Sequence, residues 1–240
     1  ETIINDPRVQ GVALTGSEGA GALVAAQAGR ALKKSTMELG GADAFIVLDD
    51  ADLDKAVKWA VFGRHWNGGQ VCCSSKRVIV HESIHDEFVR RYTEGVAQLK
   101  AGDPMEASTT LAPLSSQQAA DDVRRWIDEA VAHGATATVI GAEVPRQGAF
   151  VRPVLLTGVK PGNPVYHHEF FGPVSMIFKV KDEDEAIRLA NDSPFGLGGS
   201  VFTQDIERGK RVAAQISTGM VYINHPTAVK ADLPFGGIRR

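Results

Sequence analysis

Short apolar segments alternate with amphipathic segments along almost the whole chain, and this alternation constrains the fold more than any other feature. The apolar runs are short and rich in β-branched residues, as in Arg77–His81. The segments between them place apolar residues on one helical face, as Leu53, Val57, Ala60 and Val61 do. Strands that alternate with helices at short spacing typically form parallel sheet layers covered by helices. The sequence therefore predicts an α/β fold with a parallel sheet.

The same pattern predicts the elements in detail. Strands are expected over 10–16, 33–38, 43–48, 77–81, 136–140, 150–159, 174–180, 198–202 and 219–223, the first of them buried. Helices are expected over 17–29, 52–66, 84–99, 116–133, 183–191 and 205–216. We place a domain boundary at Gly40-Gly41, because a single strand-turn-helix unit that suits an anion precedes it and a larger α/β body follows.

Composition excludes several classes of function. The 26 basic and 29 acidic residues give a net charge of −3, so the chain lacks the basic excess that nucleic-acid binding requires. No apolar run is long enough to span a bilayer. The seven histidines and two cysteines show no metal-ligand spacing. Adjacent cysteines cannot staple a fold, which indicates a reducing compartment. We expect a soluble, cytoplasmic protein without a metal, membrane or nucleic-acid partner.

Both cysteines, Cys72 and Cys73, lie in the stretch Asn67–Ser75, after Gly68 and Gly69. A free cysteine often only fills core space. Here a glycine pair allows the backbone to approach a substrate, and a thiol near a helix N-terminus has a lowered pKa and becomes nucleophilic. The residues alone leave both interpretations open.

Two further positions are candidates for binding. Gly16 and Ser17 follow a strand and begin a helix, and the free N–H groups and the dipole of such a helix start suit an anion. The spacing from Gly16 to Gly21 is not the three-glycine dinucleotide fingerprint, so a structural turn is an equal alternative. Glu38 ends a strand beside a glycine pair, where α/β proteins hold ligands. A solvated surface carboxylate is the alternative for Glu38.

Five blocks of the chain, taken in order, resemble signatures of the aldehyde dehydrogenase superfamily. They are Leu14–Ser17, Glu38–Gly41, Gly69–Cys72, Glu169–Val174 and Pro234–Gly237. The resemblance covers essentially the whole chain and implies that about half of a complete member precedes Glu1. It implies that residues 1–40 are the C-terminal part of a dinucleotide-binding domain and that residues 41–240 are a catalytic domain that carries the thiol.

The resemblance also implies roles for individual residues. Cys72 matches the nucleophile and Glu38 the general base. The implied cofactor contacts, to NAD or NADP, are Gly16 and Ser17 at the pyrophosphate, Glu169 at the nicotinamide ribose, Phe171 near the nicotinamide ring, and Leu39. Asn67 matches a position beside the catalytic loop and is expected to end the preceding helix, and Cys73 is expected to be secondary.

These residue types suit the implied chemistry. A thiolate that adds to an aldehyde forms a hemithioacetal with a negatively charged oxygen. The Cys72 backbone N–H is one plausible donor to that oxygen, and loss of hydride then leaves a thioester. Glu38 would activate the water that hydrolyses this thioester, a task that favours a partly buried carboxylate with a raised pKa.

Within the superfamily, residues 185–199 and 224–227 look most like bacterial succinate-semialdehyde dehydrogenases. This resemblance implies succinate semialdehyde as the substrate. A carboxylate-bearing substrate favours an arginine contact. The position where one branch of that group has an arginine is Trp66 here, so His65, His225 and Lys230 are the candidates to face the substrate. The full-length protein is expected to form a homodimer or homotetramer, and this chain alone is expected to show no turnover.

Two alternatives remain at this stage. One is a non-enzymatic folding unit whose thiol merely reacts. The other is a thioester-forming acyl transferase or esterase that uses Cys72 and Glu38 without hydride transfer. Alkylation of Cys72 by iodoacetamide that NAD(P)+ slows would favour the cofactor-linked interpretation over the folding unit.

Overall fold

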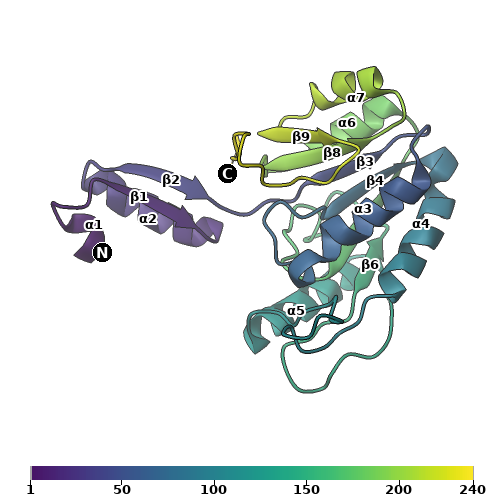
Figure 1. Cartoon of the computed structure of the whole chain (residues 1–240), viewed down its shortest axis with the longest axis horizontal. Helices are drawn as coiled ribbons and strands as arrows, with labels where there is room; N and C mark the ends of the chain where they lie inside the picture. Colours follow the sequence, from purple (N-terminus) through teal and green to yellow (C-terminus); the bar gives the residue numbers. More distant parts are fainter. Residues whose placement is uncertain (1, 240) are drawn as a thin grey trace.

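The computed structural model describes residues 2–239, and Glu1 and Arg240 lie outside the described residues. Its first unit contains α1 (Thr2–Asn5), β1 (Gly11–Thr15), α2 (Glu18–Arg30) and β2 (Lys34–Glu38). β1 and β2 pair in parallel as a two-stranded sheet. In Figure 1 this unit stands apart from the larger body and joins it through the segment that follows β2.

The second sheet has seven strands in the order β5-β6-β7-β4-β3-β8-β9. Their bounds are β3 Ala44–Val47, β4 Arg77–His81, β5 Thr136–Val139, β6 Val154–Thr157, β7 Val174–Val180, β8 Gly198–Phe202 and β9 Met220–Ile223. The α/β class with a parallel sheet is confirmed, with one exception at the edge. β5 and β6 pair antiparallel because a loop without a crossover helix, residues 140–153, connects them.

Helices cover both faces of this sheet. They are α3 (Leu53–His65), α4 (Glu82–Ala97), α5 (Gln117–Ala132), α6 (Glu183–Asn191) and α7 (Ile206–Ala213). Alternate residues of a strand point to opposite faces. Phe45 and Val47 of β3 accordingly pack with α3 and α4, whereas Ala44 and Ile46 pack with α5, α6 and α7. The body is therefore a three-layer α/β/α structure (Figure 1).

Polar side chains begin most of these helices and fix their bounds. Each of the following N-cap residues accepts a backbone N–H of the first turn through its side chain: Ser17, Asp52, His81, Ser116, Asp182 and Asp205. Such caps satisfy backbone donors that have no partner within the helix. Because these residue types are visible in the sequence, the expected helix starts lie within a residue or two of the observed ones.

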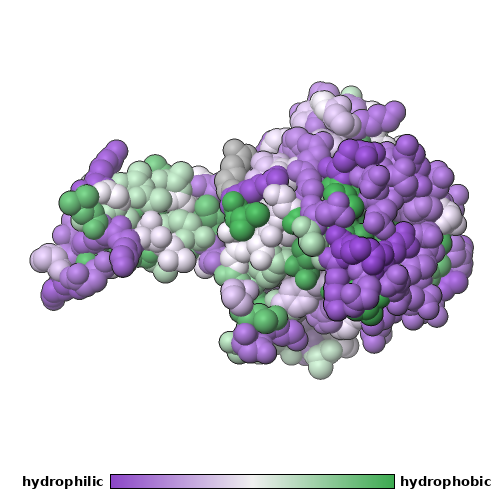
Figure 2. Space-filling model, turned by 90° about the horizontal axis from the view of Figure 1, so that it is seen from above, coloured by the Kyte–Doolittle hydropathy of each residue, from purple (hydrophilic) through white to green (hydrophobic). Residues whose placement is uncertain are grey.

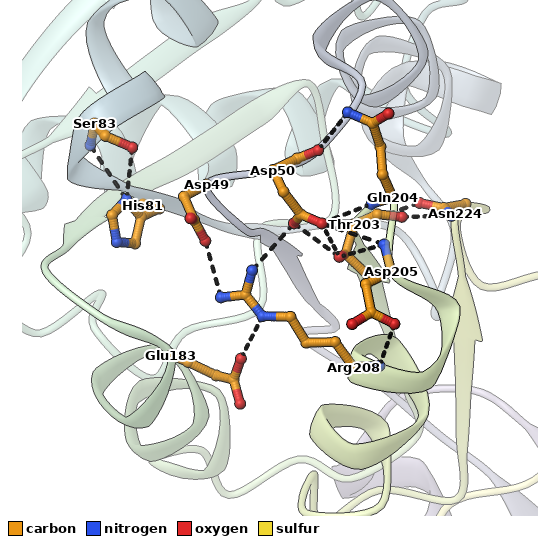
Figure 3. A network of polar contacts seen from close by, with 10 residues as sticks. All are labelled: Asp49, Asp50, His81, Ser83, Glu183, Thr203, Gln204, Asp205, Arg208 and Asn224. Carbon is orange, nitrogen blue, oxygen red and sulfur yellow. Dashed lines mark hydrogen bonds and ion pairs between the residues drawn. The ribbon is translucent and has the colours of Figure 1, made fainter.

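An ion-pair network holds the carboxyl-terminal edge of the sheet (Figure 3). The Arg208 guanidinium of α7 lies 2.8 Å from Asp49, 3.2 Å from Asp50 and 2.7 Å from Glu183. Asp50 also accepts the Thr203 hydroxyl at 2.7 Å. These contacts join the ends of β3 and β8 to α6 and α7, so this edge is closed by structural contacts.

Three expected elements differ from the structure. The strand expected over 10–16 is not buried, because only α2 packs against the two-stranded sheet and, within the described residues, no further layer covers it. Figure 2 shows a broad pale green, apolar surface on this first unit. The strand expected over 150–159 is only β6, since Pro153 has no N–H for a ladder and Gly158 turns the chain at φ +70°. The last expected helix, 205–216, ends at Ala213. No helix among residues 2–239 is long and apolar enough to cross a membrane.

Candidate active site

The turn that carries Cys72 is built from left-handed backbone. α3 ends at His65, and the 3-10 turn η1 (Trp66–Gly69) follows with φ +53° at Asn67, +65° at Gly68 and +80° at Gly69. Glycine adopts these angles without strain. A Cβ at Gly69 would also clash with the Gly172 carbonyl. The glycines therefore allow the turn to lie directly against the loop before β7, and Asn67 ends the helix as expected.

Cys72 is half-buried, Cys73 is buried, and both thiols are free. A hydrogen bond from Cys73 lowers the pKa of Cys72 to about 7, with help from the charge of Lys76 and against the effect of burial. The same hydrogen bond, together with burial, raises the pKa of Cys73. Cys72 is therefore the thiol that ionises near neutral pH. The sequence argument from a helix N-terminus is wrong, because Cys72 follows the C-terminal end of α3.

Lys76 lies completely buried next to this turn. Its ammonium donates to the Val71 carbonyl at 2.7 Å and to the Cys72 carbonyl at 2.8 Å. It also pairs with Glu169 Oε1 at 3.0 Å. Burial lowers the pKa of Lys76, and the neighbouring Glu169 carboxylate opposes that shift. Sequence reasoning missed Lys76, whose only signal is a lysine at the entrance to a strongly apolar strand.

The acid block and the glycine block expected to serve the cofactor meet at this point. Glu169 Oε1 accepts the Gly41 N–H at 3.0 Å, and a Cβ at Gly40 would clash with the Glu169 carboxylate. Phe171 remains about half exposed, with its ring 5.9 Å from the Lys76 ammonium. The glycine pair is thus required for the carboxylate to reach the backbone beside Cys72.

Arg64 fastens the thiol turn to the loop before β7. Its guanidinium is fully buried and donates to the carbonyls of Gly69 at 3.2 Å, Phe170 at 2.7 Å and Gly172. It donates further to Ser74 and to the Val174 carbonyl. Burial lowers the pKa of Arg64 to about 10, so the group keeps its charge at neutral pH. Sequence reasoning also missed this residue, since an arginine near a helix end is usually exposed.

These groups gather at the amino-terminal edge of the large sheet. Gly41 precedes β3, Cys72 precedes β4 and Glu169 precedes β7. Ligands of open parallel sheets usually lie at the carboxyl ends of the strands. Glu38, at the carboxyl end of β2, and Gly16 and Ser17, after β1, follow that rule in the small sheet. The candidate site therefore lies where the carboxyl end of one sheet faces the amino end of the other.

Glu38 and Cys72 line one cavity of about 630 Å³. Glu38 is half-buried there at the end of β2. Much of the remaining wall is aromatic, with contributions from Trp59, Phe62, Trp66 and Phe235. The structure thus brings the two predicted catalytic residues to one space of a size that suits a small organic molecule.

The predicted pyrophosphate contacts lie next to this cavity. The Gly16 N–H donates to the Glu38 carbonyl at 3.0 Å, and the Ser17 hydroxyl caps α2 by accepting the Ala20 N–H at 3.3 Å. Leu39 packs against α2 at Gly21, where a Cβ would come within 2.5 Å of the leucine side chain. The start of a 13-residue helix therefore lies at the same end of the small sheet as Glu38.

The residues expected to face a substrate differ in whether they line the cavity. His225 lines the cavity, and its Nδ1–H donates to the Pro226 carbonyl at 2.7 Å. Trp66 lines the same cavity, whereas Lys230 is exposed and is not part of the described lining. His225 is therefore the one basic side chain among the described residues that line the cavity.

His65 belongs to the core. It is 2% exposed, and its Nδ1–H donates to the Val61 carbonyl at 3.0 Å. Burial and the charge of Arg64 lower the pKa of His65 to about 3, so the ring is neutral at physiological pH. We therefore exclude His65 as a contact for an anionic substrate. In the part of the chain that the structure describes, no group of three or more His, Cys, Asp or Glu side chains is arranged to hold a metal.

The whole chain, residues 1–240, matches the sequence model of the family described as "Aldehyde dehydrogenase family". It is 52% identical over 240 residues to the succinate-semialdehyde dehydrogenase [NADP(+)] of Deinococcus radiodurans, covering all of this chain and 50% of that protein. The chain spans about half the length of the curated relatives it matches.

Solved structures of aldehyde dehydrogenases also match almost the whole of this chain and about half of their own length. The succinic semialdehyde dehydrogenase of Streptococcus pyogenes, crystallised with NADP+ as the cofactor, matches 99% of this chain and 52% of its own with a TM-score of 0.95 and 50% identity. A salicylaldehyde dehydrogenase of Pseudomonas putida, crystallised with salicylaldehyde, matches 99% of this chain and 49% of its own with a TM-score of 0.91 and 37% identity.

Proposed function

Because this chain belongs to the aldehyde dehydrogenase family, we propose that the protein oxidises an aldehyde to a carboxylic acid with NADP+ or NAD+. One observation carries the proposal: Cys72, whose pKa is lowered to about 7, and Glu38 line the same cavity. A nucleophile and a base that share one space are what a covalent mechanism with a hydrolytic second half requires.

The residues present fit a dinucleotide. Gly40 leaves room for the Glu169 carboxylate, whose proposed role is to accept hydrogen bonds from ribose hydroxyls, and Phe171 offers a half-exposed ring close to the same Lys76. The start of α2, beside Gly16 and Ser17, offers its helix dipole to a pyrophosphate, while the Gly16 N–H itself donates to the Glu38 carbonyl. When bound, the nicotinamide supplies the hydride acceptor. Leu39 adds an apolar contact at the same end of α2.

The chain's own residues account for the covalent steps. The Cys72 thiolate forms a C–S bond to the aldehyde carbon, and the carbonyl oxygen takes the charge and meets the Cys72 backbone N–H. Loss of hydride from that carbon leaves a thioester on Cys72. Glu38 then accepts a proton from the attacking water, the C–S bond breaks, and the carboxylic acid leaves with the thiolate restored.

We propose succinate semialdehyde as the substrate. The support is the identity of 50–52% to relatives that are named for this activity. His225 is the proposed carboxylate contact, because it is the basic side chain of the described lining; since its Nδ1–H is given to the Pro226 carbonyl, the contact is made by Nε2–H of the doubly protonated ring. The aromatic walls would contact the methylene groups.

A neutral aromatic aldehyde is the second candidate. The aromatic wall of Trp59, Phe62, Trp66 and Phe235 favours it, since rings prefer to pack against rings. The deciding experiment compares kcat/KM of the full-length enzyme for succinate semialdehyde, butanal and benzaldehyde, followed as NADPH absorbance. The first proposal predicts a preference for succinate semialdehyde that His225→Gln reduces on the order of tenfold, the loss expected for one charge-assisted hydrogen bond. A preference for benzaldehyde would replace it with the second.

We also propose a cytoplasmic homo-oligomer, a dimer or a tetramer. Two free thiols suit a reducing compartment. Exposed apolar side chains in the C-terminal segment, Val229, Leu233 and Ile238, suit burial against another surface. Light scattering of the full-length protein tests this, and a monomer at micromolar concentration would contradict it.

A further inference from the structure

Lys76 is a buried charge that the proposed steps do not use. Its side chain is 0% exposed, and burial of an ammonium is costly unless the group is paired and hydrogen-bonded. Here the ammonium has three oxygen partners, at 2.7, 2.8 and 3.0 Å. Two are carbonyls of the thiol turn, from Val71 and Cys72, and the third is the Glu169 carboxylate.

The contacts place this charge between the backbone of the turn that carries the thiol and the cofactor-side carboxylate. The Cys72 carbonyl that Lys76 holds also lies so close to Gly41 that a Cβ there would come within 2.7 Å of it. The Gly41 N–H in turn donates to the oxygen of Glu169 that pairs with Lys76. The thiol turn, the glycine pair and Glu169 therefore converge on one ammonium.

We propose that Lys76 is a positioning residue of the reaction: its ammonium holds the Cys72 turn and Glu169 against each other and supplies the positive charge that favours the thiolate. The proposal rests on the proposed role of Cys72 as nucleophile. A thiolate next to a lysine is favoured because the charge stabilises the ionised form. A hydrogen-bonding role alone would not need a buried charge.

Several other charged or titratable groups lie around Cys72 or Lys76 and must be held constant in a test. Around Cys72 and Lys76 the charged or titratable neighbours are Cys73 in the turn, Arg64 from α3, Asp43 before β3, Glu169 before β7, and Glu38 across the cavity. Asp43 raises the pKa of Cys72, and Lys76 lowers it. Substitution of Lys76 alone therefore isolates its contribution.

The experiment measures the rate of iodoacetamide alkylation of Cys72 against pH in the full-length protein, with tandem mass spectrometry to distinguish Cys72 from Cys73. Neither aldehyde nor cofactor is added, so failure of the proposed enzymatic function would not affect the readout. Lys76→Met removes the charge and the hydrogen bonds. Lys76→Gln removes the charge but keeps N–H donors, Lys76→Arg keeps the charge, and Lys55→Met removes an exposed lysine of α3 as the matched control.

The wild-type midpoint is expected near pH 7. Lys76→Met and Lys76→Gln should each raise it by about one pH unit, the size expected when an opposite charge near a partly buried acid is lost. Lys76→Arg and Lys55→Met should leave it within a few tenths of a unit. A wild-type midpoint in Lys76→Gln would overturn the proposal. If neither neutral variant folds by circular dichroism, Lys76→Arg decides, because a raised midpoint in that charged variant would also overturn it.

Discussion

Asp43 makes the stability of this protein depend on pH in a way that one substitution should remove. The residue lies just before β3, is 4% exposed, and accepts the Gly198 N–H at 3.1 Å. The Thr227 hydroxyl, which lies beside the same Gly198, is shared between the Asp43 carboxylate and the Gly199 carbonyl. Burial raises the pKa of Asp43 from 3.8 to about 6, although Thr227 and Lys76 oppose the shift.

The sign follows from where the proton binds more tightly. A carboxyl group whose pKa is raised in the folded state holds its proton there at a pH where the unfolded chain has released it. The free energy of unfolding therefore falls as pH rises from about 4 to about 6 and then stays lower. A shift of about two units corresponds to about 3 kcal/mol. Asp43→Asn is neutral at every pH and keeps an oxygen for the Gly198 N–H, so it should remove this penalty.

Urea unfolding of wild type and Asp43→Asn between pH 4 and pH 8 measures the effect. The variant should be nearly as stable as wild type at pH 4 and more stable by up to about 3 kcal/mol above pH 6. Asp50→Asn is the matched control of opposite sign, because Thr203 and Arg208 help to lower the pKa of Asp50, and it should lose stability at pH 8. A stability difference for Asp43→Asn that is constant with pH, or that grows toward low pH, would refute this reasoning.

Three further substitutions test how the site is held together and how the neighbouring core responds to pH. Arg64→Met should destabilise the protein by about 3–5 kcal/mol in urea unfolding, because it removes the side-chain donor from the buried carbonyls of Gly69 and Phe170; a loss below 1 kcal/mol would contradict the fastening role of Arg64. Gly69→Ala should cost clearly more than Gly134→Ala, since both have positive φ but a Cβ at Gly134 meets nothing within 4 Å; equal losses would show that the contact with the Gly172 loop is unimportant. In wild type, the buried His65 ring stays neutral while the unfolded chain takes up a proton below about pH 6.5, so the free energy of unfolding falls as the pH falls. His65→Gln should make this fall smaller; an unchanged dependence of stability on acid pH would contradict this role of His65.

The arrangement of layers could be predicted from local pattern. Strands 77–81, 174–180 and 198–202 and the helix 183–191 occur where hydrophobic period and caps predict them. The antiparallel β5 was missed because direction depends on whether a helix crosses over between two strands. The exposure of β1 was missed because burial depends on which layers pack on a strand, and local sequence does not carry that information.

Candidate site residues could be named from the sequence where the residue type itself implies a chemistry, and their roles stay predictions. Cys72 and Glu38, recognised from thiol, carboxylate and adjacent glycines, do line one cavity. Lys76 and Arg64 were missed because a lysine or arginine is exposed in most contexts, and only the fold reveals the carbonyls that surround them. His65 and His225 looked equivalent in sequence, but only His225 lines the cavity. Their roles in catalysis remain predictions for experiment.

The central claim, that Cys72 carries the acyl group and Glu38 activates the water that releases it, has one direct test. The full-length Glu38→Gln protein is mixed with succinate semialdehyde and NADP+, quenched rapidly, and digested for mass spectrometry. We expect a burst of about one NADPH per subunit with a succinyl thioester accumulating on Cys72, and neither in Cys72→Ser, because covalent catalysis with slow release leaves this signature. Steady turnover by Cys72→Ser, or a burst without an adduct on Cys72, would contradict it.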